Sequence, residues 1–225
     1  MPRDFEPSRI AVEDDRLTRA AYRALVCDGL FSQALGVLTS GALLIGCALA
    51  LGASPAYVGL LSAIPFFAQV AQLPAVVLIE RIRRRKAICV AVTLAARAML
   101  VPLAFVPLLA DRDIALTLLL LCFAVVTPLG AVGGCARMSW TCDLVPRARL
   151  GAVFSRRQLC ANGAAMLAGL LGAALVDGWA RHFPFERMGG YVGVFALAIV
   201  MAIASTWFLT RMPDVPMAAP PPPSM

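Results

Sequence analysis

The chain has 225 residues, of which 60% are hydrophobic and only 15% are charged, and its formal net charge is +7. A soluble domain is usually about 45–50% apolar and about 25% charged, so this composition, with a mean hydropathy of +0.82, excludes an ordinary soluble protein. The positive charge does not indicate nucleic-acid binding, because the basic residues lie in short gaps between apolar stretches and form no continuous face.

Six stretches of the chain are apolar enough to cross a bilayer as helices, which takes about 20 predominantly apolar residues. In chain order they are residues 29–52, 55–79, 87–110, 114–136, 158–176 and 191–210. Each stretch is expected to be helical, because backbone polar groups must be paired within the segment in lipid. The sequence therefore predicts an all-α membrane protein with a six-helix transmembrane bundle over residues 29–210.

Two polar segments flank the predicted bundle. Residues 1–28 are expected to form a cytoplasmic N-terminal segment. Part of it has a thin apolar face and could form a helix at the membrane interface. Residues 211–225 form a Pro-rich cytoplasmic tail that is expected to be extended or disordered. Proline also occurs inside the spans, where membrane helices tolerate it and bend. Kinks are therefore expected at Pro65, Pro74, Pro102, Pro107 and Pro128.

The distribution of Lys and Arg predicts the orientation of the bundle. Of the 20 basic residues, 15 lie before the first span, in the second and fourth gaps or after the last span, and three lie in the other gaps. The densest group is RIRRRK, residues 81–86. Basic residues accumulate in cytoplasmic loops, so both termini are predicted to be cytoplasmic.

The second gap, VVLIERIRRR at residues 76–85, resembles the signature loop of the major facilitator superfamily. Glu80 takes the acidic place of that signature, and Arg81, Arg84 and Arg85 take its basic places. The chain departs from the signature at two glycine positions, where it has Val76 and Arg83. Glycine allows close helix approach and tight turns, so these departures weaken the match in this loop.

The fourth gap, residues 139–158, resembles the corresponding loop of the same superfamily. Asp143 takes the acidic place, Arg149 lies in the pattern before Gly151, and a basic pair opens the fifth span. The resemblance extends over most of residues 24–210. It implies an N-terminal six-helix half of a transporter in a bacterial inner membrane, which transports a small solute by alternating access with a second half. That half is expected to be a second copy in a homodimer or a separately encoded partner. The alternative is a membrane scaffold or assembly subunit that no longer transports.

Ionisable residues within or beside the spans are the first candidates for function. Asp28 and Arg137 are expected at similar depth, and either a charge pair or two separate interfacial charges fits the sequence. Arg97 lies well inside the third span. Third spans are peripheral in the superfamily, which favours a structural role for Arg97 over one in a wet cavity. Within or beside the spans there are two arginines, Arg97 and Arg137, and one acidic residue, Asp28. This excess of positive charge weakly favours an anionic solute.

Polar and loop residues complete the candidate set. Five amides are placed in spans that line the cavity in the superfamily, where each is expected to act as a helix contact or a substrate contact: Gln33, Gln69, Gln72, Gln158 and Asn162. By the same resemblance, Glu80, Arg84 and Asp143 are expected to form a charge cluster on the cytoplasmic side. The sequence has no phosphate loop, nucleophile elbow or metal-ligand spacing, so neither an enzyme nor a cofactor or metal site is predicted.

Overall fold

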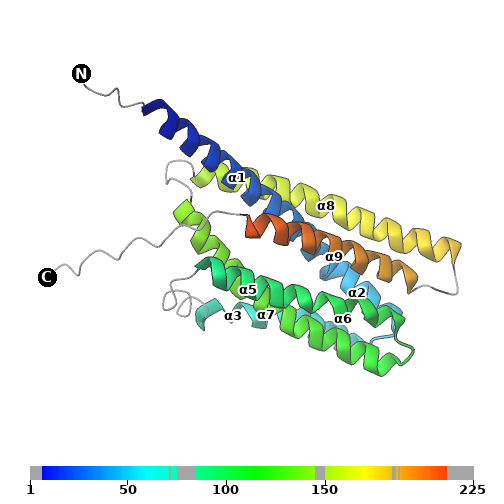
Figure 1. Ribbon diagram of the computed structural model, residues 1–225. Helices are drawn as coiled ribbons and strands as arrows, with labels where there is room; N and C mark the ends of the chain where they lie inside the picture. The colour runs from blue at the N-terminus through cyan, green and yellow to red at the C-terminus, as the bar shows by residue number, and fades with distance from the viewer. Residues whose placement is uncertain are drawn as a thin grey trace, which may run out of the picture.

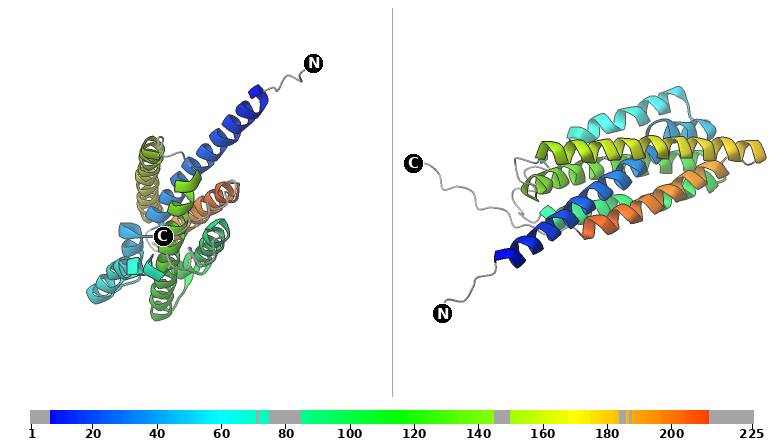
Figure 2. Two further views of the ribbon diagram at one scale, coloured as in Figure 1. Left: turned by 90° about the vertical axis from the view of Figure 1, so that its left-hand side faces the viewer. Right: turned by 90° about the horizontal axis from the view of Figure 1, so that it is seen from above.

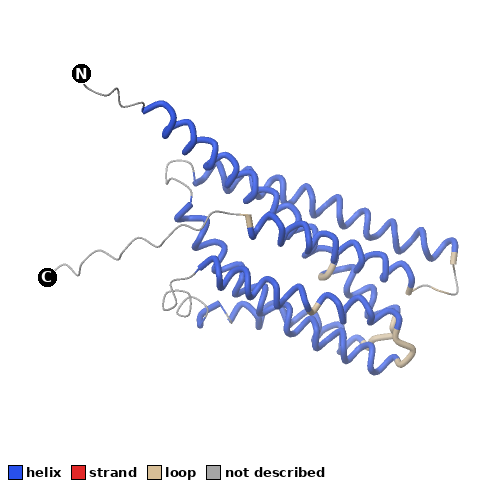
Figure 3. Tube along the Cα trace, viewed as in Figure 1, coloured by secondary structure: helices blue, strands red, loops and turns tan. Residues whose placement is uncertain are grey.

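The computed structural model describes residues 7–70, 72–74, 85–144, 150–183, 186 and 188–211. Within these ranges every regular element is a helix (Figure 3). Six helical segments are long and apolar enough to span a membrane, as the sequence predicts. They cover Tyr22–Ala50, Pro55–Pro74, Lys86–Leu108, Arg112–Ser139, Gly151–His182 and Gly189–Thr210.

The helices run alternately up and down the bundle (Figure 1). The first span contains α1 (Pro7–Leu38) and α2 (Gly41–Ala50), the second α3 (Pro55–Val70), and the third α5 (Arg85–Ala98), α6 (Leu100–Phe105) and the 3-10 turn η1 (Val106–Leu108). The last three spans are in α7 (Arg112–Leu144), α8 (Leu150–His182) and α9 (Gly189–Thr210). The start of α1 and the end of α9 lie at the same end of the bundle, as an even number of spans requires (Figure 1).

The first span differs from the prediction at its beginning and in its middle. α1 is continuous from Pro7 into the membrane-spanning segment, so the helix has no boundary at residue 29. The span instead breaks at Thr39 and Ser40, where no proline occurs. The hydroxyls of Thr39 and Ser40 donate to the carbonyls of Leu35 and Gly36, at 2.9 and 2.6 Å. Such back-bonding favours bends, and a Ser-Gly pair is a recognised cause of kinks.

The third span is interrupted where proline removes a backbone donor. α5 ends at Ala98 and α6 begins at Leu100. Pro102 has no N–H to donate to the carbonyl of Ala98, four residues earlier, so the helical ladder cannot continue there. Proline does not have this effect everywhere, because α3 and α7 continue as helices through Pro65 and Pro128.

The packing places α1 at the centre of one group of helices and α7 at the centre of another. α1 packs against α8 and α9, and α7 packs against α5 and α3 (Figure 2). Small residues lie where α1, α8 and α9 meet, at Ala34, Ala168 and Ala198. Small side chains let membrane helices approach closely. This close approach fixes α1, which carries much of the polar site described below, against its neighbours.

A glycine contact between α8 and α9 gives a testable stability difference. A Cβ at Gly190 would lie 2.8 Å from the Cα of Val176, whereas a Cβ at Gly193 would meet nothing within 4 Å. We expect Gly190→Ala to destabilise the folded protein by about 1–3 kcal/mol, because the two backbones must separate. Gly193→Ala should be neutral or stabilising by up to about 1 kcal/mol, because it removes a helix-interior glycine. Denaturant unfolding in detergent checks this, and equal stabilities of the two variants would contradict it.

Candidate functional site

A cavity of about 480 Å³ lies between α1, α5, α7 and α8, and it is called the central cavity below. Its polar wall includes Ser32, Gln33, Arg97, Arg137, Arg157 and Gln158. Its apolar wall includes Leu100, Val126, Leu129, Met138 and Phe154. Cavities of about 300–1,000 Å³ with an apolar lining and a few polar groups are typical of small-molecule sites. This cavity, with charged groups in one part of its wall and apolar side chains in the rest, is therefore the candidate functional site.

A buried ion pair joins the first and fourth spans beside this cavity. Asp28 is 0% exposed, and its Oδ2 lies 3.0 Å from the Nη1 of Arg137. The same Nη1 donates to the hydroxyl of Ser32 at 3.0 Å. The sequence left open whether Asp28 and Arg137 pair or face the headgroups separately, and the structure shows that they pair. An isolated charge is costly at this depth, so each side chain stabilises the other.

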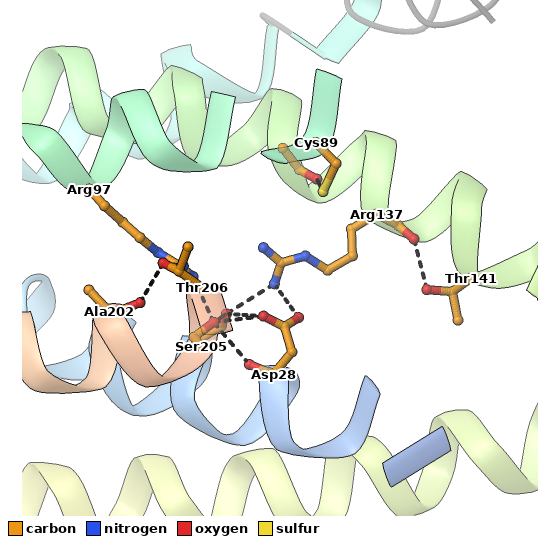
Figure 4. A network of polar contacts seen from close by, with 10 residues as sticks. Asp28, Cys89, Arg97, Arg137, Thr141, Ala202, Ser205 and Thr206 are labelled. Atoms are coloured by element: carbon orange, nitrogen blue, oxygen red, sulfur yellow. Dashed lines mark hydrogen bonds and ion pairs between the residues drawn. The ribbon is translucent and has the colours of Figure 1, made fainter. Parts of the chain in front are cut away.

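The hydroxyl group of Ser205 connects this pair to Arg97 (Figure 4). Ser205 of α9 donates to Asp28 Oδ1 at 2.6 Å, and Arg97 donates from Nη2 to the Ser205 hydroxyl at 2.6 Å. Arg97 also donates from Nη1 to Thr206. The Ser32 hydroxyl lies 2.8 Å from that of Ser205. These contacts form a continuous polar network from α5 through α9 and α1 to α7.

The sequence favours a structural role for Arg97 over one in a cavity, and the structure places Arg97 both in a helix–helix contact and in a cavity wall. Its hydrogen bonds to α9 tie the third span to the sixth, which is structural, and it also lies in the wall of the central cavity. Arg97 and Leu100 line a second, apolar groove of about 570 Å³ between α5, α6 and α9, together with Ile203 and Trp207. Arg97 therefore lies between the central cavity and this second groove, which is called the outer groove below.

Arg157 belongs to the basic pair, with Arg156, that comes just before the expected fifth span at residues 158–176. In the structure it is part of α8 and lines the central cavity, a role that the sequence does not predict. Its side chain packs over Gly29 so closely that a Cβ there would lie 2.7 Å from Arg157 Nε. This Nε is buried, and no described residue accepts a hydrogen bond from it. The neighbouring Arg156 is exposed. Successive helical residues point in different directions, so only one member of the basic pair can face the cavity.

The remaining predicted residues fall into three groups. Gln33 and Gln158 line the cavity, and Gln158 donates to Asn162 at 2.9 Å. Gln69 and Gln72 are hydrogen-bonded to each other on the second span, apart from the residues that line the cavity. The loop residues Glu80, Arg81, Arg84 and Arg149 lie outside the described residues, and the side chains of Arg85 and Asp143 are not described. The expected cluster of Glu80, Arg84 and Asp143 therefore stays a prediction.

The serine and threonine contacts of α9 were missed from sequence. Ser205 and Thr206 are adjacent hydroxyl residues in a long apolar span. This pattern suggests polar contacts within the bundle, but it does not show which side chains they contact. In the described ranges, no three His, Cys, Asp or Glu side chains are grouped so that they could hold a metal ion.

Comparison with known proteins identifies a family. A family model described as Major Facilitator Superfamily matches residues 27–224. This range includes Asp28, Arg97, Arg137 and Arg157. No curated protein and no solved structure matches the chain. The family match covers most of the chain, and with six membrane-spanning helices it shows an integral, multi-pass membrane protein that belongs to the Major Facilitator Superfamily.

Proposed function

We propose that this chain transports a small solute across a bacterial inner membrane by alternating access, with a second copy of the chain as the other half of the transporter. The observation that carries the proposal is the central cavity, which lies beside a buried charge network within a membrane-spanning bundle. Alternating access in such proteins rocks two halves around a site near the middle of the membrane. The distribution of basic residues supports an orientation with both termini in the cytoplasm.

Exposed amide side chains support the presence of a second half. Gln33, Gln69, Gln158 and Asn162 are exposed although they lie within membrane-spanning segments. Gln69 is hydrogen-bonded to Gln72, and Gln158 is hydrogen-bonded to Asn162. One such bond satisfies only part of an amide group, and exposed polar groups are costly against hydrocarbon. A second copy is the simplest cover, because twofold homodimers are the commonest oligomers. Two parallel copies, related by an axis along the membrane normal, would enclose the cavity between them.

Cysteine crosslinking with mass measurement tests the dimer. In a background without the seven native cysteines, Gln33→Cys and Gln69→Cys should each crosslink between copies, and the mass in mild detergent should be that of a dimer. Ile203→Cys is the control, because Ile203 is 66% exposed on the apolar outer groove and not on the central cavity. A monodisperse monomer without crosslinks, still active in liposomes, would refute the dimer. Copurification with a different six-helix chain would replace it by a heterodimer.

A non-transporting scaffold is the second candidate. The observation that favours it is the replacement of two signature glycines by Val76 and Arg83, because these glycines permit close helix approach. Solute uptake into liposomes that contain the purified protein distinguishes the two functions. Uptake above that of empty liposomes would exclude the scaffold.

A further inference from the structure

We infer that the central cavity binds a small organic anion, a carboxylate or a phosphate ester, and that Arg157 is the residue that contacts its charged group. The inference rests on the proposed transport function, because it names the class of solute for the same cavity. It is carried by three observations: the charge balance of the cavity, the placement of Arg157, and the mixture of polar and apolar walls.

The described residues in and beside the cavity carry an excess of positive charge. They include three guanidinium groups, from Arg97, Arg137 and Arg157, and the single carboxylate of Asp28. Asp28 pairs directly with Arg137 at 3.0 Å. Arg97 reaches Asp28 through the hydroxyl of Ser205. Both of these arginines therefore share the one acidic group, and Arg157 has no acidic partner in the described part of the bundle.

Arg157 is positioned to receive a ligand. Its Nε is buried and makes no hydrogen bond to any described residue. Arginine keeps its charge under all ordinary conditions and offers several N–H donors in a planar fork. Arg157 is half-buried, and a buried N–H donor without an acceptor is costly. A carboxylate or phosphate satisfies the fork through two parallel, charge-assisted hydrogen bonds, so an anion is the ligand that removes this cost.

Gly29 explains why the guanidinium group can occupy this position. A Cβ at Gly29 would lie 2.7 Å from Nε, 3.1 Å from Cγ and 3.2 Å from Cζ of Arg157. The missing side chain of Gly29 therefore leaves the space in which Arg157 lies across α1. The neighbouring polar groups Ser32 and Gln158 also line the cavity, and they can hydrogen-bond to polar parts of a ligand.

The size and the apolar wall of the cavity favour an organic anion over an inorganic ion. A volume of about 480 Å³ is within the range of small-molecule sites. Leu100, Val126 and Phe154 contribute apolar surface to the same cavity. Apolar side chains do not contact a hydrated inorganic ion favourably, whereas they can pack against the carbon skeleton of an organic anion.

Ligand-induced stabilisation of the purified protein in detergent tests the inference without requiring transport. The probes are benzoate and phenyl phosphate, with neutral benzamide as the control ligand, all at constant ionic strength. Either anion should raise the Tm, since a ligand that binds the folded state stabilises it. Titration calorimetry should then give an affinity that falls by about tenfold to a hundredfold in Arg157→Gln, as expected for loss of charge-assisted hydrogen bonds. The relative affinities of the two probes distinguish a carboxylate site from a phosphate site.

Arg156→Gln is the matched control, because it removes the same charge from the adjacent, exposed position of α8. It should keep wild-type anion affinity. Arg157→Lys provides a second variant if Arg157→Gln does not fold, and it should bind with intermediate affinity because it keeps the charge without the fork. Equal stabilisation by benzamide, no stabilisation by either anion, or an equal loss in the Arg156 and Arg157 variants would overturn the inference.

The outcomes separate this inference from the proposed function. A dimer that transports solute but shows no anion binding would overturn the solute class and leave the transport proposal standing. Anion binding that depends on Arg157, in a protein that neither dimerises nor transports, would support the site and overturn the transport proposal.

Discussion

Replacing Asp28 by leucine should destabilise the folded protein by about 3–5 kcal/mol, the usual cost of removing one partner of a buried ion pair. Asp28 is 0% exposed and is 3.0 Å from Arg137, and it also accepts a hydrogen bond from Ser205. Without the carboxylate, Arg137 keeps its charge in the interior of the bundle, and Ser205 loses its charged acceptor. The free energy of unfolding in detergent, from denaturant titration, measures the effect.

The double variant Asp28→Leu/Arg137→Met should recover most of the lost stability. Replacing a buried pair by apolar residues of similar size is often neutral or stabilising, because neither charge has to be desolvated. Recovery in the double variant would show that the loss in Asp28→Leu comes from the unpaired arginine. A double variant as unstable as Asp28→Leu would contradict this explanation.

Replacing Gly29 by alanine should weaken anion binding about tenfold, on the order of 1.4 kcal/mol, while the folded protein stays as stable as the wild type. The added Cβ would meet the flexible end of Arg157, at 2.7 Å from Nε, and not the backbone. Arg157 can move away at little cost, so the contact does not unfold the protein. The movement nevertheless takes the guanidinium group out of the position in which it meets the ligand, and misplaced contacts weaken recognition.

Gly193→Ala is the matched control for Gly29→Ala. Both replace a glycine inside a long helix, but α9 does not line the central cavity at Gly193, and a Cβ there meets nothing within 4 Å. Its anion affinity should equal that of the wild type. Calorimetric titration with benzoate gives both values. Unchanged affinity in Gly29→Ala would mean that the position of Arg157 does not matter for binding.

The six spans could be predicted because each apolar stretch specifies its own helix in lipid, whatever its neighbours are. The exact ends could not. α8 begins at Leu150, well before the expected residue 158, and α1 continues through the expected boundary at residue 29. Polar residues at the ends of spans lower the hydropathy without ending the helix, so hydropathy marks the lipid-facing part of a helix and not its full length.

Site residues could be found from sequence only where their position along a span was enough, and not where the packing of neighbouring helices decides the contact. The similar depth of Asp28 and Arg137 allowed a charge pair but did not distinguish it from two separate interfacial charges, and only the structure shows that they pair. Arg157 could not be found, because a basic residue next to a loop is ordinarily a topology signal, and only the packing over Gly29 shows that it points inward. The link from Arg97 to Asp28 depends on Ser205 of α9, and the sequence does not show which hydroxyl group lies opposite which arginine.

Arg97 lies in the wall of two spaces, the central cavity and the apolar outer groove. Arg97 and Leu100 border both the central cavity and the outer groove. The layer formed by these side chains therefore separates the charged wall of the cavity from the hydrocarbon at the outer groove. The hydrogen bonds from Arg97 to Ser205 and Thr206 hold this layer closed. In a bilayer no water is available to replace these bonds if they break, so surrounding lipid strengthens the separation. Wetter surroundings, such as a loose detergent micelle, weaken it and favour leakage at this depth.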